Sequence, residues 1–101
     1  MTPEFIYRGM ALKMFETYVE NNRLPLGTNF TGCPVEAADL GFQHHMEDII
    51  VLGVPYDPQD FAPSEVGDGM SHGRVGWFVN RKSLQFDTLD TTILSTSEAR
   101  R

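Results

Sequence analysis

The sequence predicts an α+β fold, a small single domain in which two helices pack on a mixed or antiparallel sheet. With 101 residues, 41 % of them hydrophobic, the chain can bury one modest core. Apolar residues recur at helical spacing in two segments of the first half, which indicates two amphipathic helices. Short runs rich in β-branched and aromatic residues dominate the second half, which indicates strands. We therefore expect residues 1–101 to form one domain.

The first half is expected to alternate strands and helices. The first predicted strand is short and aromatic and ends at Gly9, and Pro25 stops the helix that follows it. Pro34 suits the first turn of the second helix, because proline lacks the N–H that this position leaves unpaired. The expected elements are a strand over 4–8, a helix over 10–22, an extended segment over 28–31 and a helix from Pro34 to His44 or His45.

The second half is expected to be rich in strands. Residues 49–54 are a continuous apolar run whose β-branched and leucine side chains predict a central strand, buried on both faces. Residues 56–72 contain two prolines and two glycines among scattered acids, which predicts a long binding loop or lid. Shorter strands are expected over 75–79, 83–86 and 91–94, and residues 95–101 are expected to form a flexible tail.

Charge is distributed unevenly along the chain. The formal net charge is −6, and the stretch between Arg23 and Arg74 holds acidic residues without any lysine or arginine. Such a field repels nucleic acid and attracts basic protein surfaces, so direct binding to DNA or RNA is not expected. Two interpretations stay open: the acids keep the protein soluble, or they bind a protein partner with a basic surface. In the second interpretation the partner-binding residues are the loop acids Asp57, Asp60, Glu65 and Asp68.

The remaining compositional features predict a cytoplasmic protein without a membrane partner. No run approaches the roughly 20 apolar residues that a membrane span needs, and the first residues do not resemble a signal peptide. Cys33 is the single cysteine and cannot form an internal disulfide, which fits a reducing compartment. It is either a small buried residue or a nucleophile beside a helix start. No metal site is predicted, because the adjacent His44 and His45 point in different directions on a helix.

Two short motifs carry a resemblance to a known family. Tyr7-Arg8-Gly9 closes the first predicted strand, and Gly27-Thr28-Asn29-Phe30-Thr31 follows the first predicted helix. Together with the element order, over roughly residues 5–86, this resembles the ADP-ribosyltransferase family. The resemblance implies a split, strongly bent sheet that grips NAD, with Arg8 on a phosphate or ribose and Phe30 on the nicotinamide. The residues implied to contact NAD or to support its site are Tyr7, Arg8, Gly9, Thr28, Phe30 and Thr31.

The chain departs from that family at the third motif. The family uses a glutamate on a late strand to stabilise the positive charge that develops on the ribose as nicotinamide leaves. The corresponding segment here, residues 73–79, carries no acid. Glu65, in the acidic loop just upstream, is the candidate catalytic residue, and Asp68 lies beside it. The resemblance therefore implies either a divergent NAD-dependent protein-modifying enzyme or an inactive relative that binds a target.

A second functional class stays open beside the transferase. Small size, an acidic middle and the missing catalytic glutamate also resemble phage-encoded inhibitors, among them the anti-CRISPR proteins, which block basic nucleic-acid-handling proteins. This resemblance is one of character and not of motif. Independently of either class, a structural role for Arg8 also stays open, in which it only pairs with Glu4, Glu47 or another surface carboxylate, a contact worth about 0 to 1 kcal/mol.

Overall fold

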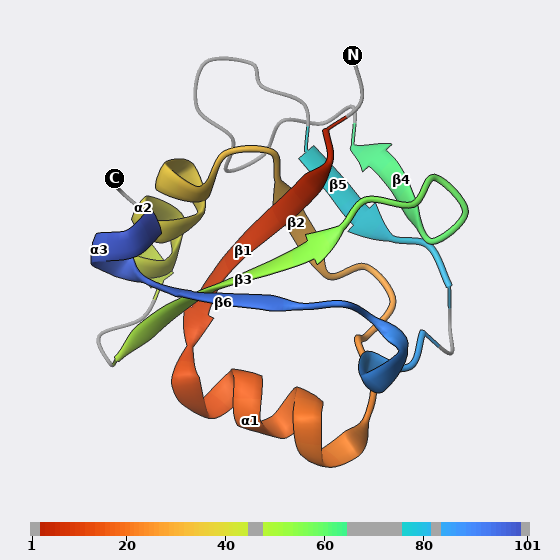
Figure 1. Ribbon diagram of the computed structural model, residues 1–101, viewed down its shortest axis with the longest axis horizontal. Coiled ribbons are helices and arrows are strands. Elements are labelled where there is room, and N and C mark those ends of the chain that lie inside the picture. The colour runs from red at the N-terminus through yellow and green to blue at the C-terminus, as the bar shows by residue number, and fades with distance from the viewer. Residues whose placement is uncertain (1–2, 45–47, 65–75, 82–83, 100–101) are drawn as a thin grey trace.

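The computed structural model describes residues 3–44, 48–64, 76–81 and 84–99, and within them it confirms the predicted α+β class. Figure 1 shows the strands as one curved sheet with helices on its two faces. The elements are β1 (Phe5–Ala11), α1 (Leu12–Asn21), β2 (Asn29–Thr31), α2 (Pro34–His44), β3 (Ile49–Pro55), β4 (Phe61–Ser64), β5 (Gly76–Val79), the 3-10 helix η2 (Phe86–Thr88), β6 (Thr92–Ser95) and α3 (Thr96–Ala99).

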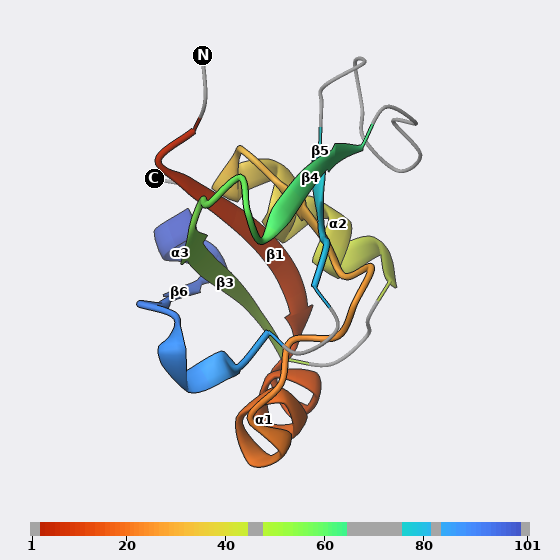
Figure 2. The same ribbon diagram turned by 90° about the vertical axis from the view of Figure 1, so that its right-hand side faces the viewer.

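The sheet is divided between β1 and β2. Its six strands have the order β4-β5-β2-β1-β3-β6, and every pairing is antiparallel. β1 pairs with β3 along all 7 of its residues, whereas among the described residues it meets β2 at the pair Tyr7↔Thr31. The sheet therefore consists of two halves, β4-β5-β2 and β1-β3-β6. Figure 2 shows them turned steeply relative to each other.

Successive side chains of a strand point to opposite faces of the sheet, and each face has its own hydrophobic core. Ile6 and Met10 point to one face of β1, and Tyr7 and Gly9 point to the other. The larger core lies on the face of Ile6 and is covered by α1 and η2. Its aromatic rings meet edge to face, with Phe30 and Phe61 at 5.5 Å and Phe15 and Phe86 at 5.8 Å between ring centroids. The smaller core lies under α2 and α3 and contains Ala37, Ala38, Val51 and Ala99.

Helix α2 lies unusually close to β1. A Cβ built at Gly9 would fall on the carbonyl oxygen of Ala37 and would lie 2.8 Å from the carbonyl carbon of that residue. Gly41, one turn further along α2, faces the same spot, since its own Cβ position is 3.3 Å from the Cα of Gly9. The backbones of helix and strand are therefore in direct contact, which requires glycine at position 9.

The strand predicted at residues 49–54 is present as β3, an interior and buried strand, although it lies next to the edge strand β6 and not in the middle of the sheet. β3 lies between β1 and β6, and Val51, Leu52 and Val54 are fully buried. The second helix begins at Pro34 and ends at His44, as expected from the sequence. The first helix begins later than predicted, at Leu12, because Met10 and Ala11 continue β1 and pair with Ile50 and Ile49. Tertiary pairing outweighs the helical spacing at those two positions.

Other predicted boundaries are wrong. β4 lies inside the expected loop 56–72, and the expected strand over 83–86 is replaced by the start of η2 at Phe86. Residues 96–99 of the expected tail form α3, and the side chain of Ala99 is 2 % exposed. Residues 65–75, which hold the rest of the expected loop, lie outside the described residues.

Candidate functional site

Arg8 lies where the two halves of the sheet separate. It follows Tyr7, the residue through which β1 pairs with β2, and its guanidinium Nη1 donates to the backbone carbonyl of Asn29 on β2 at 3.1 Å. The side chain is half-buried, and its Nε is buried without a hydrogen-bond partner among the described residues. Arg8 therefore spans the split from the side of the larger core, with one donor still unused.

The two neighbours of Arg8 point away from it. Tyr7 packs with the smaller core on the opposite face, and its ring lies over Gly53, whose Cβ position would be 3.1 Å from the Tyr7 Cε1 atom. Gly9 is the point of contact with α2. Within the predicted Tyr7-Arg8-Gly9 motif, the structure therefore places Arg8 at the split and gives Tyr7 and Gly9 packing roles.

The second predicted motif mainly supports the local backbone. The Thr28 hydroxyl donates to the Pro25 carbonyl at 2.7 Å, and the Thr31 hydroxyl accepts the N–H of Cys33 at 3.4 Å, which fixes the connection from β2 into α2. Phe30 is 1 % exposed and packs against Phe61, so no face of its ring is open to a ligand. A core role therefore takes the place of the nicotinamide contact expected for Phe30.

The predicted partner-binding acids are only partly described. Asp60 is bonded to Arg81, with 2.8 Å between Oδ1 and Nη1, and this hydrogen bond, the charge of Asp60 and that of Asp57 raise the pKa of Arg81 above its ordinary value. Asp57 is exposed, and its Oδ1 accepts the N–H of Gln59 at 2.9 Å. Glu65 and Asp68 lie outside the described residues, and so their positions relative to Arg8 are not part of the site described here.

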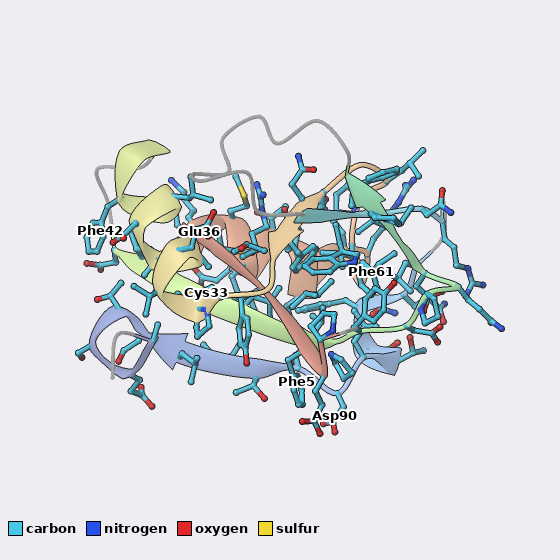
Figure 3. All side chains as sticks on the ribbon, turned by 90° about the horizontal axis from the view of Figure 1, so that it is seen from above. Phe5, Cys33, Glu36, Phe42, Phe61 and Asp90 are labelled. Carbon is cyan, nitrogen blue, oxygen red and sulfur yellow. The ribbon has the colours of Figure 1, made fainter. Side chains whose placement is uncertain are left out.

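A group of acids lies at one end of the sheet, and sequence reasoning predicted only Asp57 of them as a partner-binding residue and missed the other two. At this end of the sheet β1 and β6 start and β3 stops. The exposed acids next to these strand termini are Glu4, Asp57 and Asp90. Figure 3 labels Asp90 and Phe5, the first residue of β1, and β3 lies between the strands that they precede or begin. These acids are far apart in the sequence, and the strand order was needed to place them at the same end of the sheet. We call this group the acidic end.

Cys33, the remaining candidate nucleophile from the sequence, is half-buried just before α2. Glu36, which was not a candidate, is 7 % exposed in the first turn of that helix, where the helix dipole favours a carboxylate. Within the described part of the chain, no three His, Cys, Asp or Glu side chains are grouped closely enough to hold a metal ion. No helix in that part combines the length and apolar character that crossing a membrane would require.

In comparisons with known proteins, no protein-family model, curated protein or solved structure matches this chain. The geometry around Arg8 and the exposed charge are therefore the features from which a function can be proposed.

Proposed function

We propose that this protein is a small ADP-ribosyltransferase-like domain that binds NAD at the split of its sheet, with Arg8 as the anchor for a phosphate or ribose. The observation that carries the proposal is the position of Arg8, whose guanidinium crosses the split while its Nε has no partner among the described residues. A split sheet with an arginine that follows an aromatic residue in the first strand is what the resemblance implies for an NAD-binding fold, although β1 continues beyond Arg8 to Ala11.

The chemistry of the arginine supports this proposal. A guanidinium presents its donors as a rigid, planar fork that matches phosphate oxygens, and hydrogen bonds between charged groups are about twice as strong as neutral ones. A buried N–H without an acceptor costs about 1 to 3 kcal/mol. Because the Arg8 Nε is enclosed by protein, an anion could accept its hydrogen bond only if the split opened, and such a bond would remove this cost and favour a phosphate at this position.

Catalysis requires an acid that the described residues around Arg8 do not supply. In the proposed enzyme Glu65, which directly follows β4, fills the electrostatic role of the missing late-strand glutamate. The proposal therefore has two forms, a divergent NAD-dependent protein-modifying enzyme and an inactive relative that binds a target. Glu65→Gln separates them, since it abolishes transfer of ADP-ribose to protein in the first form and leaves NAD binding intact in both.

The test of the proposal is calorimetric titration of NAD into the unaltered protein and three variants. Arg8→Ala is expected to weaken binding about 10- to 100-fold, the scale of a hydrogen bond to a charged group. Arg8→Lys keeps the positive charge but loses the planar guanidinium fork. Its affinity for NAD is therefore expected to lie between those of the unaltered protein and of Arg8→Ala. Lys13→Ala removes an exposed charge on α1 and serves as the control. Absence of NAD binding by the unaltered protein at millimolar ligand would sink the proposal.

A second candidate function is supported by the acidic end. Exposed acids lie next to the ends of three adjacent strands there, and acidic side chains outnumber basic ones among the described residues. We propose as the alternative a non-enzymatic inhibitor, of the phage-encoded anti-CRISPR type, that binds and blocks a basic nucleic-acid-handling protein. Long-range attraction between opposite charges would then raise the association rate. Either function is proposed for the cytoplasm, where Cys33 stays reduced.

The alternative is tested by neutralising the acidic end with Glu4→Gln, Asp57→Asn and Asp90→Asn together. The melting temperature should stay nearly unchanged, because exposed charges contribute little to folding. Association with a basic partner recovered from the native host should slow about 10-fold or more at low salt, and the effect should fade near physiological ionic strength. The matched control neutralises the exposed Glu16, Glu20 and Asp39 elsewhere on the surface. Equal association rates for the unaltered protein and the acidic-end variant would exclude this surface as the binding site.

A further inference from the structure

The two outer strands of the sheet differ in their capacity to accept another strand. β4 contains Pro63, which lacks the N–H that a neighbouring strand would need. β6, at the opposite edge, consists of Thr92, Ile93, Leu94 and Ser95 and contains neither proline nor a charged residue. Natural edge strands are usually protected by exactly those features, so β6 is the less protected edge.

Hydrogen bonds at both ends of β3 show which of its residues face β1. The Leu12 N–H donates to the Asp48 carbonyl at 2.9 Å, and the Tyr56 N–H donates to the Glu4 carbonyl at 3.0 Å. Both bonds continue the β1–β3 ladder. Because successive backbone groups of a strand point to opposite sides, the even-numbered residues of β3 bond β1 and the odd-numbered residues bond β6.

The register then assigns the backbone groups of β6. Val51 is paired with Leu94 and Gly53 with Thr92, so the backbone groups of Leu94 and Thr92 point into the sheet. Those of Ile93 point to the open edge. The side chain of Ile93 is also 43 % exposed.

Ser95, the last residue of β6, confirms this assignment, and the open part of the edge stops there. The Ser95 N–H donates to Glu98 Oε1 at 3.1 Å, and the Glu98 N–H donates back to Ser95 Oγ at 3.2 Å, a capping box that begins α3. The Ser95 N–H therefore points away from β3, in phase with Ile93. Since Glu98 satisfies it, Ile93 is the residue whose N–H and carbonyl are both presented to a further strand.

We propose that the β6 edge is a docking site for an extended segment of a partner protein, which adds a strand through Ile93 and carries basic residues on both sides of an uncharged run. Backbone hydrogen bonds to an edge supply affinity in such strand addition. The charge around β6 specifies the flanking residues, because Asp90 and Glu98 are exposed on its two sides and the described residues from Leu84 to Ala99 include no basic side chain. This inference is independent of NAD binding.

A second copy of the chain is a poorer occupant. Self-pairing of two β6 edges would bring the exposed Asp90 and Glu98 of both copies to one interface, and like charges held close together are destabilising. Each copy would also bring a net charge of −6. A lysine-flanked segment of the same length meets neither penalty.

The experiment measures amide hydrogen exchange by NMR in the full chain, with and without a synthetic peptide of alternating valine and threonine that has lysines at both ends. Saturating peptide is expected to slow exchange of the Ile93 amide about 10-fold or more. The Leu94 amide, already bonded to β3, should not change and serves as the internal control. A peptide with prolines at alternate positions should not bind, and one with glutamates at its ends should bind more weakly.

The charge argument is tested by Asp90→Asn combined with Glu98→Gln, since glutamine preserves the capping box. This variant should bind the lysine-flanked peptide about 3- to 10-fold more weakly, the scale of one or two exposed ion pairs. Three results would overturn the proposal: slow exchange of the Ile93 amide in the free protein, equal binding of the proline peptide, or concentration-dependent dimerisation that protects Ile93 by itself.

Discussion

The contact between α2 and β1 predicts that Gly9→Ala strongly destabilises this protein. The added methyl would fall on the Ala37 carbonyl oxygen and lie 2.8 Å from its carbon and 3.1 Å from the Gly41 nitrogen. All three atoms belong to the backbone of α2, so no side chain can rotate to make room. Carbon atoms pack best at about 3.5 to 4.0 Å, and α2 would therefore have to retreat by about 1 Å.

The expected cost follows from what α2 covers. Retreat of the helix would open the smaller core, where Ala37 and Ala38 pack on Val51. Overpacking usually costs about 1 to 3 kcal/mol, and the rigid surroundings place Gly9→Ala at the top of that range, about 3 kcal/mol. For a domain of this size each kcal/mol lowers the melting temperature by about 4 to 8 °C, so a decrease of at least about 12 °C is expected.

Thermal and denaturant unfolding of three glycine variants tests this reasoning. A Cβ at Gly32 would meet only the ring of Trp77, at 3.3 Å, so Gly32→Ala should cost less than about 1 kcal/mol. Gly27 has a φ of +86° and nothing within 4 Å, so Gly27→Ala should cost about 1 to 2 kcal/mol through backbone strain alone. A Gly9→Ala protein that melts within about 2 °C of the unaltered one would show that α2 does not lie on β1 as described.

Three further substitutions test other parts of the fold. Leu52→Ala, at a fully buried position of β3, should cost about 2 to 5 kcal/mol in a denaturant melt, and a loss below about 1 kcal/mol would contradict the buried, interior place of β3. Glu98→Ala removes half of the capping box of α3 and should cost about 0.5 to 2 kcal/mol, whereas Glu98→Gln should cost much less. Asp60→Asn breaks the ion pair with Arg81, whose side chain is 57 % exposed, and should lower the melting temperature only slightly in low salt and not measurably in high salt.

The elements that the sequence predicted well are those with strong local signals. A continuous β-branched run marks β3, and a proline at its first position marks the start of α2. β6 was found from its threonine and isoleucine content. In each case the local sequence is enough to predict a strand or a helix without knowledge of its tertiary partners.

The elements that were missed depend on distant partners or on an overlooked cap. β4 contains Pro63 and looks like a loop, but it is held as a strand by pairing with β5. The Ser95-x-x-Glu98 spacing of α3 is a capping box that could have been recognised in the sequence. No sequence signal could have shown that Phe30 is buried against Phe61, since that contact depends on β2 and β4 both pairing with β5.

The Tyr7-Arg8-Gly9 motif shows how a short pattern combines separate constraints. Adjacent residues of a strand point to opposite faces of the sheet. Tyr7 and Gly9 therefore pack on the face that α2 covers, whereas the Arg8 side chain lies on the other face and reaches across the split to β2. Substitution of Gly9 would reduce any activity through loss of stability, and such a result would say nothing about NAD. Substitution of Arg8, which leaves the contact of α2 intact, isolates the question of anion binding. Of the three positions of the motif, Arg8 is therefore the one at which function can be tested. If Arg8→Lys leaves the melting temperature unchanged, a loss of NAD affinity in that variant can be assigned to the binding site.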